Sequence, residues 1–141
     1  AMIFGGVMEA GGFLNKITET LLKRVKSDTA LVSTTTASSI LFNVITADQY
    51  ISIVLTGKLF SDSLEKHDLA PEVLSRTIED SATVSSVLIP WNSCGATQAR
   101  VLGVATVAYL PYCFFCYLSP VINILFVLFK IKLRKRIIAA A

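Results

Sequence analysis

Three long stretches of this sequence contain no charged residue, and they restrict the chain to few kinds of fold. They run from Thr29 to Ala47, from Ser81 to Ala99 and from Val101 to Phe129. Each is about as long as the ~20 residues with which a helix crosses a bilayer. Only 16% of the 141 residues are charged and the mean hydropathy is +0.64, which suits lipid better than water.

Membrane-spanning segments are either helices or strands of a closed barrel, because backbone polar groups in lipid must bond to one another. The uncharged stretches lack the alternation of apolar and polar residues, over ~10 residues, that marks a barrel strand. The predicted fold class is therefore an all-α membrane protein. Pro111 and Pro120 interrupt the third stretch, which can hold more than one segment.

Four segments are predicted in the first half of the chain. A truncated helix is expected to end near Leu14, and a basic amphipathic connection leads to Asp28. A Ser/Thr-rich helix follows from Thr29 to about Thr46. The next segment begins at Gln49 and turns polar after Gly57, so it is expected to be short or to end at the membrane interface.

Prolines divide the rest of the chain into separate predicted helices. Pro71 suits a first helical turn, and the helix that it begins is expected to end before Pro90. Asn92 and Ser93 are good N-cap residues for a new helix, so this region predicts a broken, or discontinuous, helix. An apolar helix from about Cys94 to Leu118 follows, then a turn or kink at Ser119-Pro120 and a final segment.

Two basic clusters predict the orientation in the membrane. One follows the first apolar stretch (Lys16, Lys23, Arg24, Lys26) and the other follows the last (Lys130, Lys132, Arg134, Lys135, Arg136). Cytoplasmic loops are enriched in Lys and Arg, so both clusters are expected in the cytoplasm, with an even number of crossings between them. The expected location is the inner membrane, with several passes and a cytoplasmic C-terminus. Basic residues directly beside apolar segments do not indicate a nucleic-acid partner.

Little in the sequence favours an enzyme. No nucleophile, base and orienting group stand at a usable spacing, and no cofactor is expected. The three cysteines (Cys94, Cys113, Cys116) lie in apolar stretches and are interpreted as packing residues. His67 lies in a polar loop without a partner at metal-ligand spacing.

The first candidate site is the polar face of the Thr29–Thr46 helix. Its 3.6-residue period places five polar residues together (Thr29, Ser33, Thr36, Asn43, Thr46), and the face leads to Asp48. A carboxylate costs ~3 kcal/mol or more at membrane depth unless it is paired or hydrated. Asp48 is therefore a candidate ligand, although a loop position at the interface also fits the sequence.

The second candidate site begins with Glu79 and Asp80, directly before an uncharged run containing Thr83. Hard cations such as sodium bind carboxylate, hydroxyl and carbonyl oxygens, so Asp48, Glu79 and Asp80 are the candidate metal ligands. The break near Pro90 and Asn92 adds helix ends that can face an ion. An ordinary ion pair between Arg76 and Asp80, four residues apart, is the structural alternative.

Two segments suggest a family. LSRTIEDSATVSSVLIPWNSCGA and LGVATVAYLPYCFF resemble the C-terminal region of the NhaC-type sodium/proton antiporters, as does TADQYISIVLTGKLF. The resemblance covers about residues 4 to 129. It implies one of two inverted repeats, with residues 1–138 as a C-terminal transmembrane transporter unit, the N-terminal half absent and 139–141 an uninformative tail.

The resemblance also implies a function. It implies a secondary active transporter that exchanges sodium ions for protons by alternating access, and the alternative is a sodium/proton-coupled organic-acid exchanger of the malate/lactate type. The expected partners are the lipid bilayer, sodium and protons, small carboxylates, the N-terminal half of the same protein and a second copy in a homodimer. The residues implied near the pathway are Asn43, Thr46, Asp48, Glu79, Asp80, Thr83 and Asn92.

Overall fold

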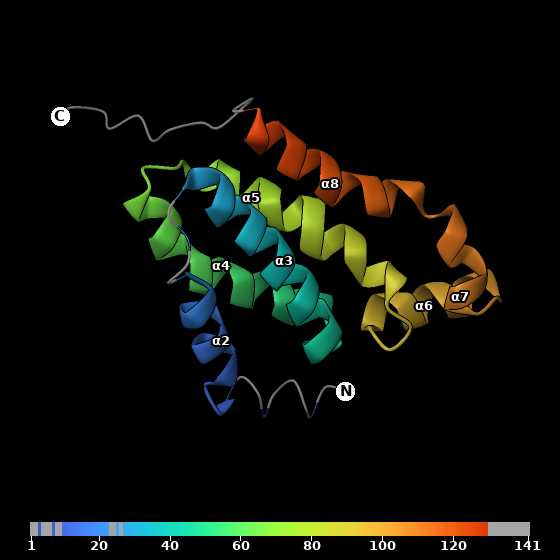
Figure 1. Cartoon of the computed structure of the whole chain (residues 1–141). Helices are drawn as coiled ribbons and strands as arrows, with labels where there is room; N and C mark the ends of the chain where they lie inside the picture. Colours follow the sequence, from blue (N-terminus) through green and yellow to red (C-terminus); the bar gives the residue numbers. More distant parts are fainter. Residues whose placement is uncertain (1–2, 4–6, 8–9, 23–24, 26, 130–141) are drawn as a thin grey trace.

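The computed structural model describes residues 3, 7, 10–22, 25 and 27–129. Within these residues the regular elements are helices, which confirms the all-α class (Figure 1). They are α2 (Phe13–Leu22), α3 (Asp28–Thr46), α4 (Gln49–Lys66), α5 (Pro71–Ile78), α6 (Ser93–Leu102), α7 (Thr106–Tyr109) and α8 (Phe114–Leu128). Both basic clusters predicted to be cytoplasmic contain residues outside the described ranges, and all of the second cluster lies outside them.

Three short irregular segments complete the chain. Helix α5 continues directly into a π-helical segment, Glu79–Thr83, which is called the π segment below. A 3₁₀ turn follows at Ser86–Leu88, and a second 3₁₀ turn, Leu110–Tyr112, connects α7 to α8. Single π turns inside helices are frequent at functional sites, and this one contains Glu79 and Asp80.

Helices α3, α4, α5 and α8 pack side by side, and α6 and α7 lie at one end of this group (Figure 1). The core between them is apolar, with Leu31, Phe42 and Phe60 completely buried. Val127 brings the last turn of α8 into the same cluster. The hydrophobic core therefore fixes α8, which is distant in sequence, against α3.

Helix α3 turns its polar side inward. Thr36, Asn43 and Thr46 are buried, whereas Leu41 and Val44 are about 40% exposed. A water-soluble helix has the opposite arrangement, with apolar residues inside. Among the described residues, α3 is also the one helix long and apolar enough to cross a bilayer. A second candidate span arises if Thr106–Tyr112 and Phe114–Leu128, which are bent by 55°, are taken together.

The helix predicted from Thr29 to Thr46 is confirmed as α3, and local chemistry explains both ends. The Ser27 side chain accepts a hydrogen bond from Ala30 N (3.2 Å) as its N-cap. Ala47 has a left-handed backbone (φ 57°) and ends the helix. Asp48 then caps α4, so the start predicted at Gln49 is also confirmed.

Two expectations for the first half of the chain require correction. The first helix does not continue to Leu14, because Gly12 has a positive φ of 69° and α2 begins at Phe13. The connection to Asp28 is thus partly helical. Of the two alternatives for the segment from Gln49, a short helix is wrong, since α4 continues for 18 residues through its polar half. An end at the membrane interface stays a prediction.

The helix predicted from Cys94 to Leu118 is also wrong. Helix α6 ends at Leu102 because Gly103 adopts a left-handed conformation (φ 69°), a common helix stop. The predicted turn at Ser119-Pro120 does not exist, since α8 passes through Pro120. The chain bends instead at Cys113, just after Pro111. Proline is tolerated inside helices whose neighbours bond to the freed backbone groups, and Ser119 and Pro120 are both buried.

Candidate functional site

Two interruptions of the helical path face each other in the structure. The first lies between α3 and α4, at Ala47 and Asp48, and the second between Leu88 and Ser93. The last carbonyls of α3 receive hydrogen bonds from the second interruption: Trp91 Nε1 donates to Val44 O (2.9 Å), Asn92 Nδ2 to Asn43 O (3.2 Å) and Ser93 N to Ala47 O (3.0 Å). The last four carbonyls of a helix generally lack donors within that helix. The second interruption therefore supplies donors at the end of α3.

Asp48 connects the starts of two helices. Its Oδ1 accepts a hydrogen bond from Ile51 N (3.1 Å) as the N-cap of α4, and its Oδ2 accepts one from the Ser93 hydroxyl (3.1 Å) of α6. The positive end of a helix dipole favours a carboxylate there. Only 8% of Asp48 is exposed. The loop position that the sequence left open is therefore correct, but the side chain is buried and bonded rather than solvated.

Asn92 is completely buried and performs the capping predicted for it. Its Oδ1 accepts a hydrogen bond from Cys94 N (3.1 Å), while its amide nitrogen reaches α3. Thr46 lies next to this contact, and its hydroxyl donates to Phe42 O (2.9 Å) and Asp48 O (3.1 Å). Both predicted residues thus stabilise the paired interruptions.

Gly95 allows the second interruption to fold tightly. A Cβ atom at this position would lie 2.1 Å from Ile89 O and 2.9 Å from Ile89 C. Only a residue without a side chain permits this approach between the first turn of α6 and the end of the preceding segment.

Asn43 links α3 to the π segment. Its amide nitrogen donates to Ala82 O (2.5 Å) and to the Ser85 hydroxyl (3.0 Å). One turn earlier, the hydroxyls of Ser39 and Ser81 are hydrogen bonded to each other at 2.6 Å. A π turn disturbs the regular pattern of backbone bonds, and the Asn43 amide supplies a donor to one of its carbonyls.

Several buried polar atoms on α3 have no hydrogen-bond partner among the residues that the structure describes. They are Thr36 Oγ1, Ser38 Oγ and Asn43 Oδ1, and Asn123 Nδ2 on α8 is a further one. A buried polar atom without a partner costs ~1–3 kcal/mol, so each such atom requires an explanation. The three on α3 are oxygens, which are the atoms that bind hard cations.

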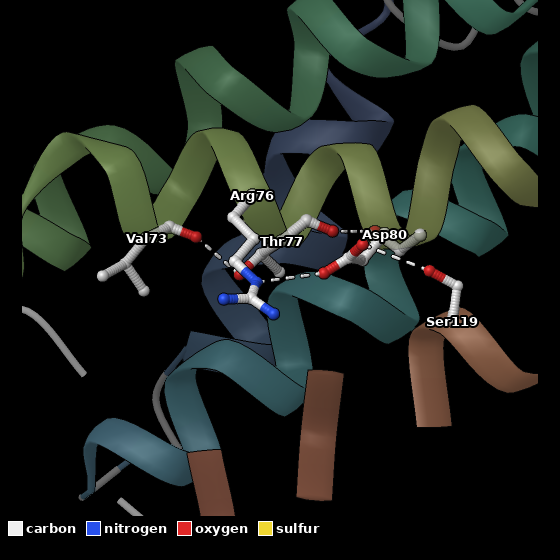
Figure 2. A network of polar contacts seen from close by, with 6 residues as sticks. Val73, Arg76, Thr77, Asp80 and Ser119 are labelled. Carbon is white, nitrogen blue, oxygen red and sulfur yellow. Dashed lines mark hydrogen bonds and ion pairs between the residues drawn. The ribbon is translucent and has the colours of Figure 1, made fainter. Parts of the chain in front are cut away.

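Asp80 connects the π segment to α8 (Figure 2). Its Oδ2 lies 3.3 Å from Arg76 Nε, and its Oδ1 accepts a hydrogen bond from the Ser119 hydroxyl (3.1 Å). The ion pair that the sequence offered as a structural alternative is therefore present. Glu79 is exposed, and its Oε2 accepts a hydrogen bond from the Thr83 hydroxyl (3.3 Å).

The three predicted metal ligands belong to different networks. Asp48 bonds to Ile51 and Ser93, Asp80 to Arg76 and Ser119, and Glu79 to Thr83. Within the described residues, no group of three or more His, Cys, Asp or Glu side chains could hold a metal ion. Sodium would be a transported substrate rather than a resident metal, so a site for it can also use neutral oxygens.

The sequence did not identify Gln49 or Ser119 as site residues. Gln49 Oε1 accepts hydrogen bonds from the Ser86 hydroxyl (2.9 Å) and the Cys94 thiol (2.7 Å), which joins both sides of the second interruption to α4. Gln49 directly follows Asp48 at the helix start, and this position in the sequence could have identified it as a site residue. Ser119 was interpreted only as part of a turn.

An open cavity of about 390 Å³ lies beside the start of α6. Ser93, Cys94, Thr97 and Gln98 of α6 line it together with Tyr50 of α4 and Val87. The positive end of the α6 dipole favours a negatively charged ligand there, although the N–H groups of Ser93 and Cys94 already donate to Ala47 O and Asn92 Oδ1.

Comparison with known proteins shows a consistent set of relatives. The model of the Na+/H+ antiporter family matches residues 1–131. The chain is 42% identical to the Na+/H+ antiporter NhaC of Alkalihalophilus pseudofirmus, over 89% of this chain and 27% of the relative. It is also 42% identical to the arginine/ornithine antiporter ArcD of Halobacterium salinarum, over 89% of this chain and 26% of the relative.

A third relative is the malate-2H+/Na+-lactate antiporter of Bacillus subtilis, which is 34% identical over 82% of this chain and 25% of the relative. The chain thus spans about a quarter of the length of the curated relatives that it matches. No solved structure matches it. Since the family model covers nearly the whole chain, this chain belongs to the Na+/H+ antiporter family.

Proposed function

We propose that the protein containing this chain exchanges sodium ions for protons by alternating access across the inner membrane. The observation that carries the proposal is the inward polar face of α3, which includes the unpartnered buried oxygens of Thr36 and Asn43. These atoms lie on the helix that packs against the π segment and its two acids. A partly dehydrated cation would compensate the cost of burying such oxygens.

The proposed mechanism is competition between ions. A deprotonated carboxylate holds sodium, and protonation of the same group releases it. Asp80 is the acid that best fits this role, because it is half-buried and connects two helices. Asp48 fits less well as the exchanging acid, since both of its oxygens accept hydrogen bonds at helix starts. Asn43, Thr46 and Thr83 would supply or position neutral oxygens, while Asn92, as the N-cap of α6, would hold the interruption in shape. No cofactor takes part in this mechanism.

The proposal extends to how this chain is arranged within the whole transporter. The segments that end at Leu88 and begin at Ser93 would be the two halves of one discontinuous membrane helix. The chain would be one of two inverted repeats, and the N-terminal half of the same protein would complete the site. Two copies would form a homodimer in the lipid bilayer.

The decisive experiment measures transport by the full-length protein in proteoliposomes. With sodium as the sole substrate ion, an imposed sodium gradient is expected to move protons. Malate, lactate or arginine is then added in separate runs. Sodium movement that occurs only with an organic substrate would contradict the sodium/proton proposal.

An organic-acid exchanger is the second candidate, and the cavity beside α6 favours it. The cavity is lined by the first residues of a helix, which suit a carboxylate, and two of the relatives are named for substrates that carry one. In such a protein, small carboxylates would bind near Asn92 and Ser93.

A pair of substitutions distinguishes the two candidates. For a sodium/proton exchanger, Asn92→Ala is expected to cost ~1 kcal/mol or more in stability through the lost N-cap, with the apparent KM for sodium nearly unchanged. For an organic-acid exchanger, Asn92→Ala and Ser93→Ala would raise the KM for the acid at least tenfold. Ser27→Ala, which removes the N-cap of α3, is the matched control for stability.

Orientation can be tested independently. Cysteines placed at Lys26 and Lys135 are expected to react with an impermeant thiol reagent from the cytoplasmic side, because both positions lie in basic clusters. Cells and inverted vesicles are labelled in parallel, after Cys94, Cys113 and Cys116 are replaced by serine. Reaction from opposite sides would refute the even number of crossings, and reaction of the cysteine at position 135 from the outside would refute the cytoplasmic C-terminus.

A further inference from the structure

We propose that Arg76 is a tethered cation that occupies Asp80 when sodium is absent, competes with transported sodium, and holds α8 in place until sodium displaces it. This inference rests on the proposed sodium/proton exchange and assigns a role within it. Figure 2 shows three of the side chains that carry it, Arg76, Asp80 and Ser119.

The geometry of the Arg76–Asp80 ion pair allows the two side chains to separate. Arg76 approaches Asp80 through a single nitrogen, Nε, at 3.3 Å. The strongest arginine–carboxylate pairs use two parallel hydrogen bonds at about 2.7–2.9 Å. The side chains of Arg76 and Asp80 are also 40% and 27% exposed, respectively. A small cation can therefore reach the carboxylate without unfolding its surroundings.

Both members of the pair contact α8. The Arg76 guanidinium lies 5.4 Å from the centre of the Phe126 ring, and Asp80 accepts a hydrogen bond from Ser119. Ser119 and Phe126 are seven residues apart on α8, which is about two helical turns. Separating Arg76 from Asp80 would therefore change two attachments of α8.

The charged residues on the neighbouring helices indicate that Arg76 is the counter-ion of Asp80. Helix α8 contains no charged residue between Phe114 and Leu128. The single charged residue of α3, Asp28, lies at the start of that helix beside His67. Within the described residues, Arg76 forms the one ion pair to Asp80. Sodium must compete with Arg76 for Asp80. The attraction between Arg76 and Asp80 therefore lowers the apparent affinity of the site for sodium.

The experiment compares variants of the full-length protein in proteoliposomes. Arg76→Gln removes the competing charge and is expected to lower the apparent KM for sodium at least threefold. Arg76→Lys keeps a positive charge and is expected to leave the KM within twofold of the wild-type value. Arg76→Met retains an apolar contact with Phe126 and replaces Arg76→Gln if that variant does not fold.

The matched control is Lys16→Gln, which removes a positive charge from an exposed helical pair with Glu19 and is expected to leave the KM unchanged. A KM that is unchanged or raised in both neutral variants would overturn the role of Arg76, while the wild-type protein still exchanges sodium for protons. A wild-type protein that moves no sodium would instead refute the proposed function.

Discussion

Replacing Gly95 with alanine is expected to remove most of the folded protein. The new Cβ would lie 2.1 Å from Ile89 O, and real Cβ atoms essentially never approach backbone this closely. The first turn of α6 would have to move away from Ile89. That movement would break the bonds from Asn92 to Asn43 O and from Ser93 N to Ala47 O. We expect a loss of about 3 kcal/mol or more in stability.

The measurement is the yield and thermal midpoint of the full-length protein in detergent. Gly57→Ala provides a matched control on α4, because the nearest atom to its added Cβ is Ile78 Cδ1 at 3.9 Å. Alanine is favoured over glycine inside a helix by about 0.5–1 kcal/mol, so this variant is expected to be at least as stable as the wild type. Equal stability of the two variants would show that the second interruption is looser than the structure indicates.

The tightness at Gly95 illustrates what the sequence could and could not predict. Pro90, Asn92 and Gly95 predicted an interruption, because each residue type has a local backbone or capping preference that acts within one turn. The close approach of Ile89 depends on how the chain returns over α6. A local pattern contains no such information.

The contacts of Asn43 and Asp48 could likewise be predicted only in part. The helical period placed Asn43 and Thr46 on one face of α3, and this face is buried as a polar face would be in a transporter. The sequence did not predict that Asn43 would donate to Ala82 O and Ser85, or that Asp48 would bond to Ser93. These contacts join residues about 40 positions apart, so they depend on tertiary packing.

The errors in the last third have a different cause. Apolar composition alone predicted one helix from Cys94 to Leu118, because a long, mostly apolar stretch does not show where a helix ends. Gly103 was the available stop signal. Pro120 was given too much weight, since it lies inside α8 where Ser119 packs against the π segment. Proline has less effect on a helix whose other contacts are strong.

Neutralising Asp80 to asparagine is expected to abolish sodium-driven proton movement, with at least a hundredfold loss of rate. The substitution preserves the shape of the side chain and an oxygen for Ser119, but it removes the charge that would hold sodium or a proton. Its structural cost is small, because partly exposed ion pairs such as that with Arg76 contribute only ~0–1 kcal/mol. We therefore expect near-normal yield of an inactive protein.

Two companion variants make the result specific to Asp80. Asp62→Asn removes an exposed carboxylate on α4 and is expected to retain transport. The double variant Arg76→Gln/Asp80→Asn removes both charges of the pair. If the ion pair served only to hold the fold, the double variant would recover the activity that Asp80→Asn had lost, because no unpaired charge would remain. If Asp80 exchanges the ions, the double variant stays inactive although it is folded, since no carboxylate is left to bind sodium.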